Sequence, residues 1–400
     1  MSGTAAAPVT GRIMTPFFKL LIALWALGTA AGVVRWTGGL GAATAMNDGY
    51  PWGIWIALDV VVGTALACGG YAVAILAYVF NRGQYHPIVR PAILTSALGY
   101  SVAGIAIFFD VGRYWGLWKI PLYAHRWNLD SALLEVALCV MAYTAVLWIE
   151  LSPAVVEQWL ASEDGSLRAR AARILPGLSR ALPFVLALGL LLPTMHQSTL
   201  GALWLVAPSK LHPLWHTPLL PLLFLVSCLA MGYAVVVLEG TFSSRAFKRP
   251  RETAMFATLG TAIAGVTLAW VFLRLVDLAL RGRLGLVLGS GGLSFMFLLE
   301  NALAIAGAVV LLRPRLGRRS GMQLAAAFLV ASAGVLYRID TFLVAYDPGP
   351  GWSYFPSVGE ILVTLGLVAT ETMAYLFIVR KLPILAGAQA AAPHPDPEAT

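Results

Sequence analysis

The stretch WGIWIALDVVVGTALACGGY (52–71) decides the fold class, because it is long and apolar enough for a membrane span yet carries a carboxylate. Apolar segments repeat from about residue 16 to residue 381, in a chain of 400 residues that is 59% hydrophobic and 12% charged. Their length, without alternation of apolar and polar positions, is typical of transmembrane helices rather than a membrane barrel. The sequence therefore predicts an all-α polytopic integral membrane protein.

We predict about ten transmembrane helices. They cover 16–35, 54–80, 90–110, 131–151, 181–206, 214–239, 253–278, 292–312, 322–346 and 357–380. Residues 1–389 then form one transmembrane domain, and the Ala- and Pro-rich residues 390–400 are expected to be a disordered tail. The first segment also resembles a signal peptide, so its cleavage is an alternative that leaves the other spans unchanged.

The basic residues predict the orientation of the spans. One alternate set of loops holds only Arg35, Arg113, Lys119, Arg126, Lys210, Arg281 and Arg283. The other set holds more than twice as many, gathered mainly in 168–180, 245–251, 313–319 and 380–381. Because cytoplasmic loops are enriched in Lys and Arg, both termini are predicted in the cytoplasm. The net charge of +8 then belongs to a membrane rim, and the basic residues are too scattered to predict nucleic-acid binding.

Ionisable side chains lie inside the predicted spans. They are Asp59, Glu135, His196, Arg274, Asp277, Glu300, Arg338, Asp340, Glu360 and Glu371. A charge near the bilayer centre costs about 2.5–3.5 kcal/mol on insertion scales, so a use is expected for some of them. Composition alone leaves two classes open: a redox subunit that handles protons, and a proton- or ion-coupled secondary transporter.

The cysteines and histidines limit the cofactors that the chain can hold. Its three cysteines, Cys68, Cys139 and Cys228, are far apart in sequence, whereas an iron–sulfur cluster usually takes four cysteine ligands. Only His196 lies well inside a predicted span, and an embedded b-type haem wants two axial histidines. We therefore predict no haem, no iron–sulfur cluster and no metal site.

Several motifs occur in a characteristic order. They are GIWIALD (53–59), HPIVRPA (86–92), MHQSTLG (195–201), KLHPLW with TPLLPL (210–222), and YFPS with GE (354–360). Together they resemble the polysulfide-reductase membrane subunit family, NrfD/PsrC, over about residues 50–385. The likeness is closest to the ten-helix, HybB-type branch found with nickel–iron hydrogenases.

The resemblance implies a function and a set of partners. Members carry electrons between periplasmic iron–sulfur proteins and the membrane quinone pool, so menaquinone or ubiquinone is the expected substrate. The implied partners are a periplasmic ferredoxin-like iron–sulfur subunit and the large and small subunits of a Ni/Fe hydrogenase. The implied location is the bacterial inner membrane. The family's two four-helix bundles correspond to the second to fifth and sixth to ninth spans.

Quinone reduction takes two electrons and two protons, and it calls for hydrogen-bond donors and carboxylates at one membrane depth. We expect Asp59, Asp110, Arg113, Glu135 and His196 to hold the quinone. Glu135 matches the family's glutamate near the start of its helix. Proton transfer is assigned to Glu135, His196, Tyr100 and Glu239, although a structural hydrogen bond is the alternative for His196 and Tyr100.

Charged residues of the second half have two interpretations. Arg274 and Asp277 share a helix face, whereas Arg338 and Asp340 do not and need partners on other helices. These groups either neutralise one another or form a second polar cavity with Glu300, Glu360 and Glu371. The aromatic loop 113–127 is expected to anchor in the bilayer or to dock the iron–sulfur partner.

Overall fold

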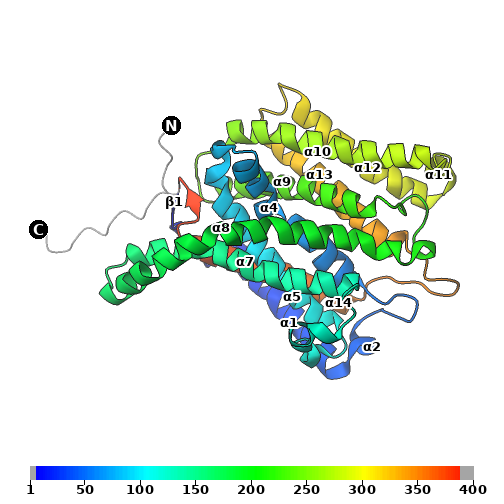
Figure 1. Cartoon of the computed structure of the whole chain (residues 1–400), viewed down its shortest axis with the longest axis horizontal. Helices are drawn as coiled ribbons and strands as arrows, with labels where there is room; N and C mark the ends of the chain where they lie inside the picture. The colour runs from blue at the N-terminus through cyan, green and yellow to red at the C-terminus, as the bar shows by residue number, and fades with distance from the viewer. Residues whose placement is uncertain (1–5, 388–400) are drawn as a thin grey trace, which may run out of the picture.

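Ten long apolar helical segments dominate the computed structural model, which describes residues 6–387 (Figure 1). The predicted tail 390–400 lies outside the described residues. Each segment is long and apolar enough to cross a membrane, so the predicted all-α polytopic class is confirmed. The first and last described residues meet in a short antiparallel pair, β1 (Ala6–Ala7) and β2 (Leu385–Ala386).

The first bundle contains four spans. The second span of the chain is built from η1 (Trp55–Val62), α3 (Gly63–Leu66), α4 (Gly69–Ala74) and η2 (Ile75–Val79). It packs with α5 (His86–Asp110), which packs on α7 (Ala132–Leu160), and α7 lies along α8 (Gly165–Ala202).

The second bundle contains the next four spans, drawn above the first in Figure 1. They are α9 (Leu220–Ala246), α10 (Thr253–Leu280), α12 (Gly292–Leu312) and α13 (Ser320–Ile339), which continues as the π-helical η8 (Asp340–Val344). These helices contact one another in turn, and the two bundles meet where α9 packs on α8 and α4.

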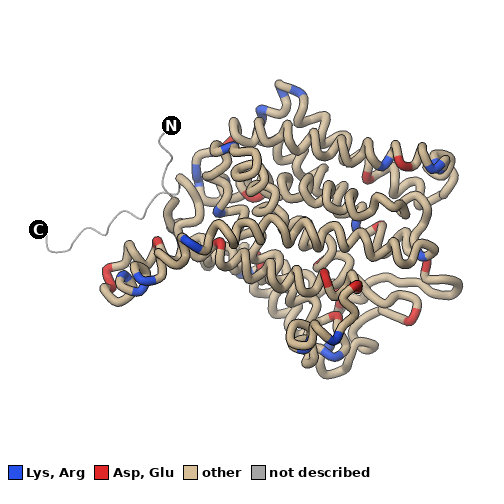
Figure 2. The backbone as a smooth tube through the Cα atoms, viewed as in Figure 1, with Lys and Arg blue, Asp and Glu red and all other residues tan. Residues whose placement is uncertain are grey.

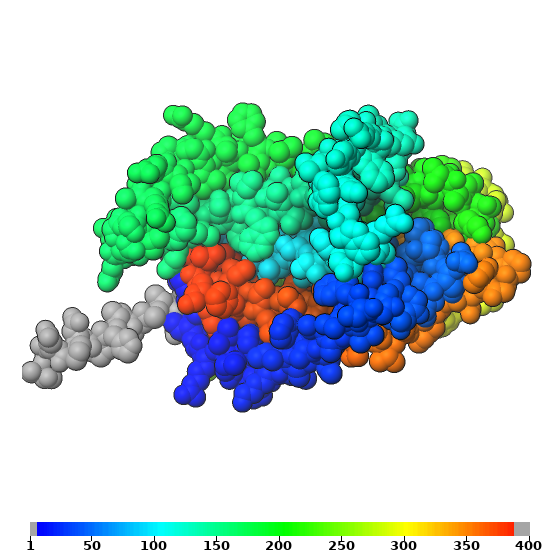
Figure 3. Space-filling view, turned by 90° about the horizontal axis from the view of Figure 1, so that it is seen from below, coloured from blue at the N-terminus to red at the C-terminus, as the bar shows by residue number. Residues whose placement is uncertain are grey.

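Two further helices flank the first bundle. The chain begins its spans with α1 (Pro16–Gly38) and ends them with α14 (Val358–Lys381), and these two pack along each other. They lie side by side in the space-filling view, α1 in dark blue and α14 in orange to red (Figure 3). Short helices fill the connecting loops: α2 (Leu40–Ala43), α6 (Lys119–Leu122) and α11 (Leu286–Gly289).

The helix α8 is much longer than the span predicted for it, 181–206. Its 38 residues correspond to about 57 Å, whereas the hydrocarbon layer is about 30 Å thick. The part before residue 181, expected to be a loop, continues the helix alongside α7 and projects beyond the bundle (Figure 1). Hydropathy predicted the apolar half of α8 and not the basic half.

Charged residues gather near the two ends of the helices, and the middle is largely uncharged (Figure 2). We call the end that carries α2, α6 and α11 the α11 end, and the opposite end, with the strand pair, the β1 end. The basic segments 168–180, in the first half of α8, 245–251 and 313–319 lie at the β1 end, as the alternation of the spans requires. The uneven distribution of Lys and Arg seen in the sequence therefore corresponds to a difference between the two ends of the structure, with most basic residues at the β1 end.

Candidate functional site

The centre of the first bundle holds a buried tyrosine–histidine pair. Tyr100 of α5 and His196 of α8 are both fully buried, and the Tyr100 hydroxyl lies 2.7 Å from His196 Nε2. His196 Nδ1 lies 2.8 Å from the carbonyl oxygen of Leu192, which can only accept. Nδ1 therefore carries the proton of the neutral ring, and Nε2 accepts the hydrogen bond that Tyr100 donates.

A chain of polar groups continues from this pair into the second bundle. The Gln197 amide nitrogen lies 3.2 Å from His196 Nε2 and donates to Thr64 Oγ1 at 3.1 Å. The Gln197 carbonyl oxygen accepts from Arg338 Nη2 at 3.0 Å. These contacts connect α5, α8, α3 and α13, so one network crosses from the first bundle to the second.

Arg338 is fully buried at the junction of the bundles, yet it pairs with no carboxylate in the described part of the chain. Its guanidinium donates to the carbonyl oxygens of Val61 at 3.2 Å and Phe224 at 2.9 Å. It also lies 4.6 Å from the centre of the Phe224 ring. Backbone dipoles and an aromatic face therefore hold this positive charge close to the tyrosine–histidine pair.

An apolar groove of about 700 Å³ leads to Tyr100 along the outside of α5 and α7. Its walls include Ile105, Phe108, Trp115 and Met141. Tyr100 lies at the end of the groove farthest from the aromatic loop, as its place ten residues before the end of α5 requires. The volume is that of a typical small-molecule site, and the walls suit an apolar ring with a hydrocarbon tail.

A few polar groups lie at this deep end of the groove. Ser101 and Thr144 line it beside Tyr100, and Trp148 Nε1 donates to Ser101 Oγ at 3.0 Å. Tyr143 packs edge-on against Tyr100, with ring centres 4.6 Å apart. The groove therefore combines apolar walls with a few hydrogen-bonding groups, of which Tyr100 contacts His196.

Other predicted site residues lie away from the groove. Asp59 faces α14, where its carboxylate accepts from Thr364 Oγ1 at 2.8 Å. Asp110 ends α5 near Arg35, and Arg113 is exposed in the following loop. Glu135 is half-buried in the first turn of α7 and is not among the residues that line the groove.

Glu239 lies toward the β1 end and not with the others. It accepts a hydrogen bond from the Tyr375 hydroxyl of α14. Glu239 and Glu371 line a second apolar hollow, of about 560 Å³, between α9 and α14. Of the predicted proton-transfer residues, the structure thus brings only Tyr100 and His196 into contact.

Glu360, which sequence analysis considered for a second polar cavity, has a structural position. Its carboxylate accepts from the backbone nitrogens of Ala45 at 2.9 Å and Ser357 at 2.8 Å. The Tyr354 hydroxyl donates to it at 2.6 Å, and burial with this neighbouring carboxylate raises the pKa of Tyr354. Glu360 therefore caps α14 and ties together the loops of the α11 end.

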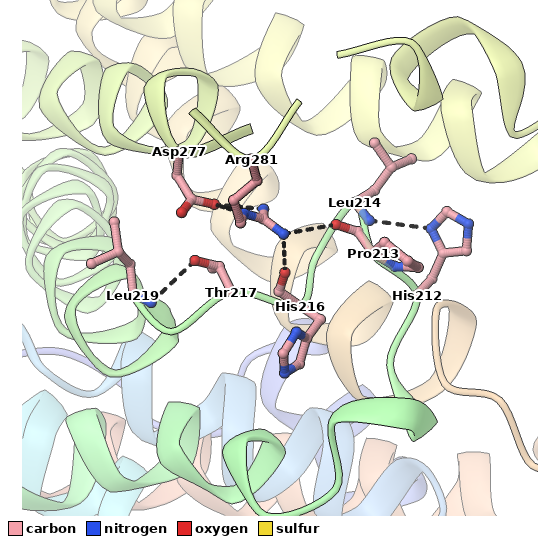
Figure 4. A network of polar contacts seen from close by, with 8 residues as sticks. All are labelled: His212, Pro213, Leu214, His216, Thr217, Leu219, Asp277 and Arg281. Atoms are coloured by element: carbon pink, nitrogen blue, oxygen red, sulfur yellow. Dashed lines mark hydrogen bonds and ion pairs between the residues drawn. The ribbon is translucent and has the colours of Figure 1, made fainter. Parts of the chain in front are cut away.

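The motif KLHPLWHTP docks on the end of α10 (Figure 4). Arg281 Nε donates to Asp277 Oδ2 at 2.7 Å, and Arg281 Nη1 donates to the carbonyl oxygen of His216 at 2.7 Å. Burial, then the nearby Arg281 and Arg283, lower the pKa of His216. Arg274 and Asp277, for which a shared helix face was predicted, belong to two different ion pairs. Asp277 pairs with Arg281, and Arg274 pairs with Glu300 at 2.5 Å.

Sequence reasoning missed the partners that complete the central network. Gln197 was visible only as a polar neighbour of His196, and its bond to Arg338 joins residues 141 apart in the chain. No sequence pattern identified Thr364, which donates to Asp59, or Tyr375, which donates to Glu239, because both resemble ordinary residues of a membrane span.

The chain matches one family model and is similar to several known membrane subunits. Residues 42–345 match the family model described as polysulphide reductase, NrfD. The chain is 38% identical, over 94% of both sequences, to a protein of Escherichia coli K12 named probable Ni/Fe-hydrogenase 2 b-type cytochrome subunit. It is 25% identical, over 86% of both, to a menaquinone reductase integral membrane subunit of Nitratidesulfovibrio vulgaris. An Hdr-like menaquinol oxidoreductase integral membrane subunit of Archaeoglobus fulgidus is 24% identical over 90% of both.

Proposed function

The chain belongs to the polysulphide reductase NrfD family, and from this premise we propose that it is the quinone-reactive membrane subunit of a respiratory oxidoreductase. Electrons pass between an iron–sulfur partner and the membrane quinone pool, menaquinone or ubiquinone. The observation that carries this proposal is the apolar groove that ends at Tyr100, which is itself bonded to His196.

The tyrosine–histidine pair supplies the proton chemistry of the quinone. Once His196 has taken up a proton at Nε2, a quinone oxygen at Tyr100 receives the proton of the tyrosine hydroxyl, and His196 Nε2 returns its added proton to the tyrosine oxygen. In the opposite direction, a quinol hydroxyl donates to Tyr100 as Tyr100 donates to His196. Two electrons from the partner and two protons complete the reduction, and a relay of this kind contributes about 10²- to 10⁴-fold to a rate.

We place the α11 end on the periplasmic side of a bacterial inner membrane, with both termini in the cytoplasm. The concentration of basic residues at the β1 end supports this orientation. The iron–sulfur partner, ferredoxin-like, then docks over the loop that carries Trp115 and Trp118, which are both exposed. Identity to the E. coli relative favours the large and small subunits of a Ni/Fe hydrogenase as the electron source.

The remaining predicted residues fit a proton route rather than the quinone pocket itself. Asp59, Asp110, Arg113 and Glu135 lie toward the α11 end and outside the walls of the groove. Glu239 lies toward the opposite end, with Tyr375. We propose that Glu239 receives protons from the β1 end and that Glu135 exchanges them near the groove, which couples quinone chemistry to proton movement.

The name of the E. coli relative includes a b-type cytochrome, and an embedded b-type haem requires two axial histidines. In the described residues only His196 lies deep within a span, and its two ring nitrogens already bind Leu192 and Tyr100. A pair of facing axial histidines is therefore not offered by the spans. We propose that this subunit works without a haem or an iron–sulfur cluster of its own.

Filling the groove tests the proposed quinone site directly. Gly104 lines the groove, and a side chain built on it meets no atom within 4 Å, so Gly104→Leu occupies the groove without a clash at Cβ. The matched control is Gly265→Leu in α10, which is equally open but faces away from the groove. The assay is quinone reduction by the assembled complex, alongside reduction of a water-soluble dye by the partner subunits.

We expect Gly104→Leu to raise the KM for quinone at least about tenfold, a loss of 1.4 kcal/mol in binding. Dye reduction and the Gly265→Leu control are expected to match the wild type. Unchanged quinone kinetics in Gly104→Leu would show that the quinone binds elsewhere.

A further inference from the structure

A cluster of buried ionisable residues in the second bundle has no part in the chemistry described above. Arg274 of α10 binds Glu300 of α12 through Nη2 and Oε1, at 2.5 Å. Asp340, at the start of η8, shares a helix face with Tyr337 three residues earlier, and the centre of the Tyr337 ring lies 4.7 Å from the guanidinium carbon of Arg274. Asp340 therefore lies on the side of α13 that faces Arg274. All three are at most 3% exposed, and helices α10, α12 and α13 surround them.

The charges of this cluster do not balance. Two carboxylates share one arginine, so one negative charge is left over when both are ionised. Arg338 is two residues before Asp340, but residues two apart do not face each other on a helix, and Arg338 is committed to Gln197 and to carbonyl oxygens. A buried charge without a partner costs several kcal/mol, which a single bound proton removes.

The polar atoms around the cluster are also incompletely satisfied. Within residues 6–387, neither oxygen of Asp340 has a hydrogen-bond partner, and the same holds for Glu300 Oε2 and Arg274 Nη1. The hydroxyl of Tyr337, whose ring packs on Arg274, is likewise unpartnered. Buried polar groups are normally paired with protein or water, so this concentration of free donors and acceptors is the environment of an exchangeable proton and its waters.

One helix connects this cluster with the tyrosine–histidine pair. Arg338 at the end of α13 reaches into the network of His196, and Asp340 begins the π-helical turn that follows. Because π-helical segments rearrange the hydrogen-bonding pattern of a helix, they often occur at functional positions. The last turn of α13 and the π-helical turn after it therefore connect the tyrosine–histidine pair physically with Asp340.

We propose that Asp340, Glu300 and Arg274 form a second proton-binding site, which takes up and releases one proton as the quinone is reduced and reoxidised. The proposal rests on the proposed quinone function, and it adds a site in the second bundle that does not touch the quinone. No electron is transferred at this site: the proton moves between water and one carboxylate oxygen, and Arg274 retains its charge.

The test is infrared difference spectroscopy of the whole complex during quinone reduction. A protonated carboxylic acid gives a carbonyl stretching band that is absent from a carboxylate. We expect such a band to change on reduction in the wild type and to be lost in Asp340→Asn. The matched control is Asp277→Asn, which removes a buried carboxylate of the same bundle that is already paired with Arg281.

The rate of quinone reduction separates this inference from the function it rests on. We expect Asp340→Asn to change that rate by less than about tenfold, because Asp340 does not contact the groove. A complex that reduces quinone normally, but whose band survives in Asp340→Asn, overturns the second proton site alone. A wild-type complex that does not reduce quinone overturns the proposed function.

Two further measurements keep the test decisive. If Asp340→Asn does not accumulate, the carboxyl carbons of aspartate or of glutamate are isotope-labelled in the wild-type complex. The carbonyl stretching band must then shift in one of the two labelled samples. The spectra are repeated without sodium ions. A band change that requires sodium shows that the cluster binds a metal cation, and this result also overturns the proposal.

Discussion

Replacing Tyr100 by phenylalanine isolates the relay on which the proposed chemistry depends. The substitution removes one oxygen atom and keeps the ring that lines the groove and packs on Tyr143. His196 Nε2 loses the donor at 2.7 Å but keeps the Gln197 amide at 3.2 Å. We therefore expect a stability cost of about 1 kcal/mol, since the nitrogen is not left without a donor.

The effect on the rate should be far larger than the effect on folding. Loss of a positioned proton donor typically lowers a rate about 10²- to 10⁴-fold, so we expect kcat for quinone reduction to fall at least about 100-fold. The KM for quinone should change by less than about threefold, because the apolar walls that bind it are intact. The assay is quinone reduction by the assembled complex, driven by the natural electron donor of the partner subunits.

Two controls make the result interpretable. Tyr143→Phe removes a hydroxyl from the neighbouring ring and leaves the bond between Tyr100 and His196 intact, so its kcat should stay near that of the wild type. Dye reduction by the partner subunits reports assembly and should be unchanged in both variants. The relay is refuted if Tyr100→Phe retains more than about a tenth of the wild-type kcat in a fully assembled complex.

Three further predictions concern the fold. Gly232→Val should lower the melting temperature strongly in detergent, because a Cβ at Gly232 would lie 2.6 Å from the carbonyl oxygen of Cys68; a melting temperature equal to the wild type would contradict this close approach. Glu360→Ala should cost at least about 2 kcal/mol, since three donors lose a buried acceptor, whereas Glu360→Gln should cost less by the same thermal measurement. The pKa of His216 is lowered on folding, so docking of its loop is fully stable above about pH 6.5 and weakens as the pH falls below it. The protection factors of that loop, which correct for the intrinsic pH dependence of hydrogen exchange, should fall on acidification in the wild type and fall less in His216→Gln, where His212 still titrates.

Hydropathy predicted the positions of the membrane spans well, but it predicted the full lengths of the helices less well. It located the apolar core of each of the ten segments, because the cost of burying polar groups in hydrocarbon leaves a clear mark on composition. It could not show that α8 begins at Gly165, since its basic first half leaves the membrane and is supported by packing along α7. Three prolines, at 176, 183 and 193, also argue locally against the continuous helix that is observed.

The site was predictable in its residue types and not in its pairings. His196 and Tyr100 were identified because a histidine and a tyrosine are unusual deep in apolar segments, and the structure joins them. Their grouping with Asp59 failed, because that aspartate points to α14, whose position relative to the second span no local pattern reveals. The partners of buried charges come from helices distant in sequence, so charge patterns mark such residues without naming their neighbours.

Irregular backbone gathers where the two bundles meet, and this explains why the central charge lies there. The second span is π-helical over Trp55–Val62 and changes its winding near Cys68, and η8 follows α13 at the facing position. Hydrocarbon cannot satisfy the backbone groups that such segments free, so they are tolerated only within protein. The carbonyl oxygens of Val61, in η1, and Phe224, in α9, accept hydrogen bonds from Arg338. A carboxylate in their place would close an ion pair and neutralise the arginine. Neutral carbonyls leave its positive charge in place, where it disfavours a second positive charge on His196. The arrangement requires the two bundles to be in contact, because Val61 and Phe224 belong to different bundles.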